Sequence, residues 1–222
     1  MTTSQGRAGA FLTAVRLEGY RDSYKTGIED RAANIPCGNL LILSVADGAG
    51  GVSGGARAAD QVVEILRREA LDSLADPAGD RWRDALSRAD ERLANDRDAG
   101  ETTAVVVAVS PTGVSGASVG DSQAWIVRAD GCQDLTRRQE RKPLLGSGMA
   151  YPIAFECGFD AGTVLLGSDG LFKYAEPDSI CRAANDPDIE AAADRLLALV
   201  RLPSGNLKDD VAIILCRRRV DR

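Results

Sequence analysis

The stretch LLILSVADGAGG at residues 40–51 joins an apolar run to an Asp-Gly pair and two further glycines. Its first part is a short apolar run, which favours a buried β-strand. The run ends at Asp47, and Gly48, Gly50 and Gly51 follow almost at once. Asp-Gly after a strand is by itself most often a turn. Aspartates recur at the ends of other apolar runs, however, and this recurrence favours a functional role for Asp47 over a simple turn.

Further short apolar segments are predicted as strands, at residues 103–109, 113–119, 124–128, 163–166 and 211–216. Two consecutive helices are predicted by their one-sided apolar pattern at 56–71 and 81–95, and a third at about 188–200. Turn residues at 111–113 and 128–131 predict two hairpins. This order lacks the regular alternation of a doubly wound sheet, so we expect an α+β layered sandwich. The irregular stretch at about 137–154 is predicted to be a surface loop that borders a site.

Composition limits the class of protein. The 222 residues fit one domain over 1–222, and 27 basic against 33 acidic side chains give a net charge of −6, which offers no general attraction to nucleic acid or an anionic membrane. No apolar run approaches the roughly 20 residues of a membrane span, and the start lacks a signal-peptide pattern, so cytoplasmic localisation is expected.

The residue types that are rare or absent exclude several chemistries. The five cysteines are scattered and form no Cys-x-x-Cys pair, so we expect small buried thiols without a disulfide framework or a zinc site. The chain has no histidine, which excludes a Ser-His-Asp triad, a Cys-His pair and histidine-based zinc sites. Carboxylates must therefore carry any chemistry.

Four aspartates lie at the ends or starts of the apolar strands: Asp47, Asp121, Asp169 and Asp209. If these strands lie side by side, like charges converge, and their repulsion is relieved by cations or by protonation. Oxygen ligands of this kind suit Mg²⁺ or Mn²⁺. The alternative for any one of them is a turn, and Asp209-Asp210 could equally be a solvated start of a strand.

An ordered set of motifs resembles the PPM-type, or protein phosphatase 2C, metal-dependent serine/threonine phosphatases of the bacterial type. The motifs are Glu29-Asp30, Asp47-Gly48-Ala49-Gly50-Gly51, Gly120-Asp121-Ser122, Ser168-Asp169-Gly170-Leu171 and Asp209-Asp210-Val211, and Gly-Glu-Thr-Thr-Ala at 100–104 supports them. The resemblance spans nearly the whole chain. It implies an antiparallel β-sandwich flanked by helix pairs, in four layers α-β-β-α.

The resemblance also implies a role for each matching residue. Asp47 bridges two metal ions, the Gly48 carbonyl binds one of them, and Asp169 and Asp209 complete the second metal site. Glu29 and Asp30 bind directly or through the water shell. Asp121 helps Asp169 to hold a third, weaker ion.

The sequence departs from the family pattern at two positions. Lys25 stands where the family has a phosphate-binding arginine, and a lysine lacks the bidentate geometry of arginine. Ala49 replaces a histidine that many eukaryotic relatives carry. By the resemblance, Asp47, Asp169 and Asp209 are the expected catalytic residues. Lys25 is the expected substrate-binding residue, and the alternative is an exposed lysine on a strand.

The resemblance implies a monomeric protein phosphatase that hydrolyses phosphoserine and phosphothreonine with water activated by two, or three, Mn²⁺ or Mg²⁺ ions, and that opposes a cognate kinase. One alternative is a SpoIIE-like regulatory phosphatase acting on an anti-sigma antagonist. Another is a catalytically silent binding module with the same fold. The basic loop residues Arg137, Arg138, Arg141 and Lys142 either recruit an acidic phosphoprotein or form a solvated surface.

Overall fold

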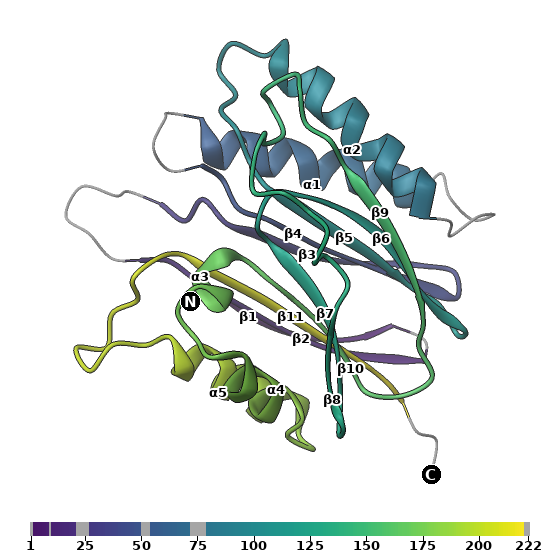
Figure 1. The fold of residues 1–222 in the computed structure, drawn as a ribbon, viewed down its shortest axis with the longest axis vertical. Coiled ribbons are helices and arrows are strands. Elements are labelled where there is room, and N and C mark those ends of the chain that lie inside the picture. Colours follow the sequence, from purple (N-terminus) through teal and green to yellow (C-terminus); the bar gives the residue numbers. More distant parts are fainter. Residues whose placement is uncertain (1, 9, 21–26, 50–53, 72–78, 220–222) are drawn as a thin grey trace.

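Two antiparallel sheets pack face to face between two groups of helices in this computed structural model, which describes residues 2–8, 10–20, 27–49, 54–71 and 79–219 (Figure 1). The first sheet has the order β1-β2-β11-β10-β7-β8, and the second has the order β3-β4-β5-β6-β9. The first sheet contains β1 (Thr2–Ala8), β2 (Phe11–Glu18), β7 (Gln123–Arg128), β8 (Gly131–Asp134), β10 (Thr163–Gly167) and β11 (Val211–Arg218). The second contains β3 (Arg31–Cys37), β4 (Leu40–Ala46), β5 (Ala104–Val109), β6 (Gly113–Val119) and β9 (Ile153–Gly158).

Helices cover the outer face of each sheet. The helices α1 (Gly55–Leu71) and α2 (Gly79–Ala94) lie over the second sheet, and α4 (Pro177–Ala184) and α5 (Ile189–Leu199) lie over the first (Figure 1). A short helix, α3 (Asp169–Phe172), follows β10 directly. The predicted α-β-β-α sandwich with flanking helix pairs is therefore confirmed.

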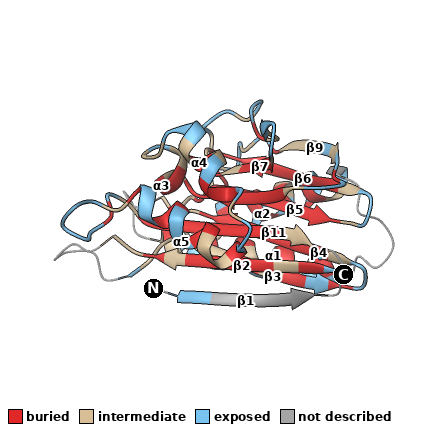
Figure 2. Cartoon of the chain, turned by 90° about the horizontal axis from the view of Figure 1, so that it is seen from below, coloured by how far each residue is buried: buried red, intermediate tan, exposed pale blue. Residues whose placement is uncertain are grey.

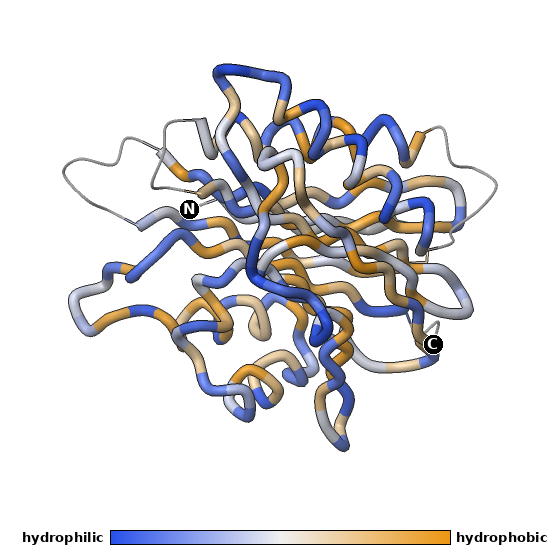
Figure 3. Tube along the Cα trace, turned by 45° about the horizontal axis from the view of Figure 1, so that its top comes forward, coloured by the Kyte–Doolittle hydropathy of each residue, from blue (hydrophilic) through white to orange (hydrophobic). Residues whose placement is uncertain are grey.

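Three hydrophobic clusters hold the four layers together. In β4, Leu41, Leu43 and Val45 belong to the cluster between the two sheets, whereas Ile42 belongs to the cluster under α1 and α2. A strand that is covered on both faces is apolar at nearly every position, as the buried pattern of β4 and β5 illustrates. Figure 2 shows this burial along the strands, and Figure 3 shows hydrophobic residues on the inner strands with hydrophilic ones at the loops.

The sequence pattern missed strands that contain polar residues. In β2, Arg16 is buried because its guanidinium pairs with Asp194 at 2.6 Å and Glu190 at 2.7 Å on α5. These partners lie far along the chain, so no local pattern indicates them. The predicted loop at about 137–154 ends earlier, because β9 begins at Ile153 and pairs with β6.

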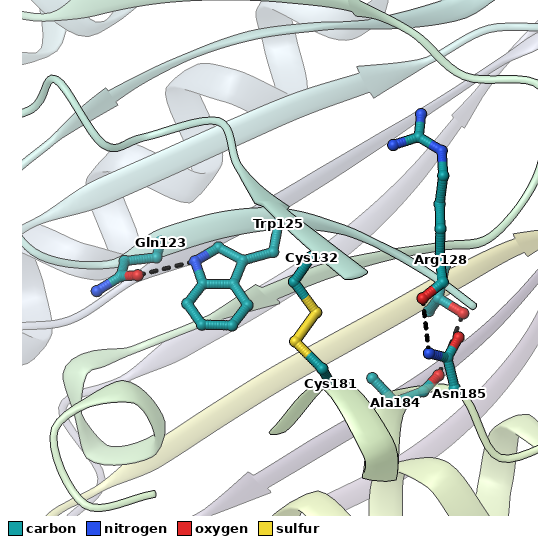
Figure 4. Close-up of a disulfide and its surroundings, with 8 residues drawn as sticks. Gln123, Trp125, Arg128, Cys132, Cys181, Ala184 and Asn185 are labelled. Atoms are coloured by element: carbon teal, nitrogen blue, oxygen red, sulfur yellow. Dashed lines mark hydrogen bonds between the residues drawn. A yellow bond between two sulfur atoms is a disulfide. The ribbon is translucent and has the colours of Figure 1, made fainter. Parts of the chain in front are cut away.

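The cysteine prediction is wrong for one pair. Cys132 on β8 and Cys181 on α4 form a disulfide with a Cα–Cα distance of 6.1 Å (Figure 4). The two residues are 49 positions apart and belong to no short motif, so only the packing of α4 against the β7–β8 hairpin brings them together. Cys37 and Cys216 are buried free thiols, as expected, whereas Cys157 is only half-buried.

Across the described ranges, no helix is both long enough and apolar enough to cross a membrane.

The disulfide predicts a redox-dependent stability. Replacing both Cys132 and Cys181 by serine should lower the free energy of unfolding by up to about 4 kcal/mol. Without the disulfide, the unfolded chain gains the conformational entropy that a cross-link over a loop of this length removes. Urea unfolding with and without dithiothreitol measures the effect, with Cys157→Ser as the matched control. An unfolding midpoint of the wild type that is the same with and without dithiothreitol would contradict the disulfide.

Candidate metal centre

Asp47 follows β4 directly, and both of its backbone polar groups are held by the residues that precede β5. Its N–H donates to Thr103 Oγ1 at 3.1 Å, and its carbonyl accepts from Thr102 Oγ1 and Thr103 N, both at 2.9 Å. Thr102 and Thr103 are themselves buried. The backbone of Asp47 is therefore fixed, and its carboxylate is left for other contacts.

Gly48 allows two segments to approach at the start of α1. A Cβ at this position would lie 2.5 Å from the carbonyl carbon of Gly55, the first residue of α1. The Gly48 N–H donates to the Glu29 carbonyl at 3.4 Å, so the Glu29-Asp30 segment lies beside Asp47-Gly48. Glycine at position 48 thus permits this close backbone approach, and a ligand role for its carbonyl stays a prediction.

Asp210 organises the segment that carries Glu29 and Asp30. Its Oδ1 accepts from Tyr20 N and its Oδ2 from Glu29 N, both at 2.8 Å, and the side chain is buried. The alternative of a solvated start of the strand is therefore wrong for Asp210. Its contacts bring Glu29 and Asp30 to the start of β11 and hence to Asp209.

Asp169 begins α3, directly after β10. Ser168 locks this point to β11, because its N–H donates to the Ala212 carbonyl at 3.1 Å and its Oγ accepts from Ala212 N at 3.0 Å. A Cβ at Gly170 would lie 2.0 Å from the Asp210 carbonyl oxygen. Only glycine allows this contact, which sets the Ser168-Asp169-Gly170 segment against Asp209-Asp210.

Asp121 lies in the turn between β6 and β7. Gly120 has φ +83°, a left-handed conformation that favours glycine, and the Ser122 hydroxyl lies 2.6 Å from Thr103 Oγ1. The Asp121 Oδ2 accepts from Arg141 Nε at 2.8 Å and from Arg141 Nη2 at 2.6 Å. Arg141 belongs to the loop after β8, and no local pattern indicates this pair.

The carboxylates perturb one another. Burial, followed by the charges of Asp30, Asp169 and Asp209, raises the pKa of Asp47. Burial also raises the pKa of Asp30, where hydrogen bonding to Ser168 and Asp47 acts in the opposite direction and the charges of Asp210 and Asp169 add to the rise. The pKa of Asp169 is raised by burial and by Asp121 and Asp209, against the opposing charge of Lys173 at 3.6 Å. Several like charges therefore share one partly desolvated place.

The residues present fit a hard divalent cation. Among the described residues, no group of three or more acidic or cysteine side chains is arranged so that it could hold a metal ion in this structure. The Asp30 Oδ2 atom, however, is buried without a hydrogen-bond partner. The other candidate ligand atoms of the centre are oxygens as well. A cation would satisfy that atom and offset the mutual repulsion of Asp30, Asp47, Asp169 and Asp209.

The fold thus brings together most of the residues that the sequence singled out. Asp30, Asp169 and Asp209 all act on Asp47 through their charges. Glu29 precedes Asp30 in the chain, and Asp121 lies close enough to act on Asp169. Lys25 lies outside the described residues. Sequence reasoning missed Arg141 as a partner of Asp121 and the hydroxyl groups of Thr102, Thr103, Ser122 and Ser168, although the Gly-Glu-Thr-Thr motif already drew attention to the two threonines.

Comparisons with known proteins give a family and a fold. The family model of stage II sporulation protein E (SpoIIE) matches residues 38–219. A bacterial serine phosphatase is 21% identical with a TM-score of 0.81, covering 95% of this chain and 98% of its own. The serine/threonine phosphatase Stp1 from Staphylococcus aureus is 20% identical with a TM-score of 0.79, covering 93% and 95%. The catalytic domain of the serine threonine protein phosphatase PstP, in complex with 2 manganese ions, is 19% identical with a TM-score of 0.79, covering 93% and 97%.

At these identities the solved structures establish a shared fold, the PPM phosphatase fold. No curated protein sequence matches the chain.

The contact at Gly170 predicts a stability effect. Gly170→Ala should lower the free energy of unfolding by roughly 1–3 kcal/mol, because the added methyl group meets the Asp210 backbone, which cannot move without disturbing β11. Gly158→Ala is the matched control, since a Cβ there meets nothing within 4 Å. Urea unfolding of both variants measures the difference, and equal stability of the two would contradict the packing described.

The raised pKa of Asp47 predicts an effect of pH on the metal-free protein. Above the ordinary Asp pKa of about 4, the Asp47 carboxyl group loses its proton in the unfolded chain but keeps it in the folded protein. The free energy of unfolding therefore falls as pH rises. In chelator at about pH 8, Asp47→Asn should therefore melt at a higher temperature than wild type.

Added Mn²⁺ should reverse that order, because the ion stabilises wild type by binding the folded state and the variant lacks one carboxylate ligand. Thermal unfolding with EDTA or MnCl₂ gives both comparisons. A wild-type melting temperature unchanged by Mn²⁺, together with a less stable Asp47→Asn variant in EDTA, would contradict a cation site at these carboxylates.

Proposed function

The chain belongs to the SpoIIE family, and on this premise we propose that it is a metal-dependent protein phosphatase that hydrolyses phosphoserine and phosphothreonine. The observation that carries the proposal is the convergence of Asp30, Asp47, Asp169 and Asp209 at one end of the sandwich, with the buried Asp30 Oδ2 unpartnered. The fold shared with bacterial serine/threonine phosphatases supports the same reaction.

The ions proposed are Mn²⁺ or Mg²⁺, and the PstP structure with 2 manganese ions supports a binuclear centre. Asp47 would hold both ions, with Asp169 and Asp209 on one side and the Gly48 carbonyl, Glu29 and Asp30 on the other. When bound, such ions supply an activated water and neutralise the charge of a phosphoryl group.

The chain itself supplies position and shape. The threonine contacts fix the backbone of Asp47, and Ser168 and Gly170 fix Asp169 against the start of β11. Such rigid placement keeps several carboxylates in one place despite their repulsion. The chain has no histidine to protonate the leaving alkoxide, and water is the proposed donor of this proton. Lys25 stays the proposed contact to the substrate phosphate.

The substrate would be a phosphorylated protein, and two kinds of physiological role fit. In the first, the enzyme opposes a serine/threonine kinase on that protein. In the second, it removes phosphate from an anti-sigma antagonist, a role that the match to the SpoIIE family model over residues 38–219 supports only in part. The set of retained carboxylates argues against a silent binding module, because a module without catalysis would not need several acids in one partly buried place.

Replacement of one carboxylate tests the reaction. Asp169→Asn should reduce Mn²⁺-dependent hydrolysis of a phosphothreonine peptide by at least about 100-fold with folding retained, since a ligand is lost while the side-chain volume is kept. Malachite-green release of phosphate measures turnover, and circular dichroism reports folding. Asp178→Asn on α4, an exposed side chain outside the carboxylate cluster, is the matched control.

Full activity of Asp169→Asn, or wild-type turnover that continues in excess chelator, would rule out this mechanism. Absence of turnover in the wild type despite measured Mn²⁺ binding would favour the silent binding module.

A further inference from the structure

A protein cation already binds the carboxylate that would hold a third metal ion. Arg141 donates from both Nε and Nη2 to the same oxygen of Asp121, at 2.8 and 2.6 Å. The Asp121 side chain is 23% exposed and that of Arg141 is 73% exposed, so the pair lies at the rim of the centre and not in the core. A guanidinium delivers one positive charge in a fixed planar geometry, which suits a carboxylate.

The fold holds the loop that carries Arg141 on both sides. After Arg141, Leu145 exchanges two backbone hydrogen bonds of 3.0 Å with Thr102, the same residue that binds the Asp47 carbonyl. Before it, the Gln139 N–H donates to the Thr136 carbonyl at 2.8 Å. The loop is therefore joined to the segment before β5 after Arg141 and is held by a local turn before it.

A buried carboxylate on α2 strengthens the anchor at Leu145. Asp90 Oδ1 accepts from Gly146 N at 2.7 Å and from Gly148 N at 3.0 Å, and its Oδ2 accepts from Ala150 N at 2.9 Å. These three bonds fix the chain just beyond Leu145. These bonds restrict the backbone of the loop near Asp121, so the Arg141 side chain loses less conformational entropy when it pairs with Asp121.

Asp121 is equally well placed to act on the centre. The left-handed turn at Gly120 and the contact of Ser122 with Thr103 fix its backbone, and its charge acts on Asp169. The charge of Asp169 in turn contributes to raising the pKa of Arg141. Asp121, Asp169, Arg141 and Lys173 all line one cavity of about 360 Å³. A cation bound at Asp121 therefore faces the same space as Asp169.

We propose that the Arg141 guanidinium takes the place of a third metal ion at Asp121, so that this chain binds its metals as a binuclear centre only. The proposal rests on the proposed function, because it assumes that the other carboxylates hold two ions. A divalent ion at Asp121 would meet the positive charge of Arg141 within a few ångströms, and this repulsion weakens its binding. The chain then has a cation at the rim of its centre that does not depend on the metal concentration.

The ion pair between Arg141 and Asp121 should contribute little to the stability of the fold. Exposed ion pairs contribute only about 0–1 kcal/mol to stability, so removing Arg141 should leave the protein folded. What should change is the number of ions bound. Removal of Arg141 leaves Asp121 and Asp169 beside an open cavity without the competing guanidinium, which is the arrangement that the sequence resemblance assigned to a third ion.

The experiment counts Mn²⁺ ions on chelator-treated, full-length protein by the electron paramagnetic resonance signal of free Mn²⁺, with titration into the millimolar range. Wild type should bind two ions, and Arg141→Gln should bind a third, weaker one. The double variant Arg141→Gln/Asp121→Asn should return to two. Arg137→Gln, which changes another arginine of the same cavity, is the matched control and should stay at two. Circular dichroism verifies that each variant is folded.

Two results would overturn the inference alone: a wild type that binds three ions and loses one on Asp121→Asn, or an Arg141→Gln variant that stays at two. In both cases the binuclear centre and the proposed reaction would stand. A wild type that binds no Mn²⁺ would overturn the inference together with the proposed function.

Discussion

Repulsion between partly buried carboxylates is the constraint around which this end of the molecule is organised. Asp30, Asp169 and Asp209 all act on Asp47 through their charges, and burial strengthens these effects because water screens the charges less. Left to themselves, such groups would move apart or retain protons. The surrounding structure prevents the first outcome, and a divalent cation at the proposed centre would make the second unnecessary.

The frame that resists this repulsion is made of backbone contacts more than of side-chain charges. The two threonines before β5 hold Asp47, Ser168 joins the end of β10 to β11, and Asp210 binds the N–H groups of Tyr20 and Glu29. The glycines at 48 and 170 allow the segments to touch where any side chain would separate them. The hydrophobic interfaces of the sandwich then keep the strand ends in register.

The two sides of the centre differ in how their charge is balanced. At Asp121 the chain provides its own cation from an anchored loop, whereas Asp30 retains a buried oxygen without a partner. A buried acceptor without a hydrogen-bond partner destabilises the folded state, whereas forming or breaking an exposed ion pair changes its free energy only slightly. This asymmetry explains why ligand chemistry is expected at the inner carboxylates, and why the outer one can be served by a guanidinium.

The sequence by itself determined the layered α+β architecture, because the apolar runs of β4, β5 and β6 and the one-sided helices have periods that only covered strands and surface helices satisfy. It also determined which aspartates could meet, since each follows or precedes such a run. It missed β2, whose buried Arg16 is balanced by α5, and it missed the Cys132–Cys181 disulfide.

Only the tertiary structure decided that Asp210 is a buried clamp, that Arg141 binds Asp121, and that Asp30 is left with an unpartnered oxygen. These features depend on partners many residues away along the chain. Local patterns report the period and polarity of a segment, whereas charge balance and hydrogen bonding depend on which segments the fold places side by side.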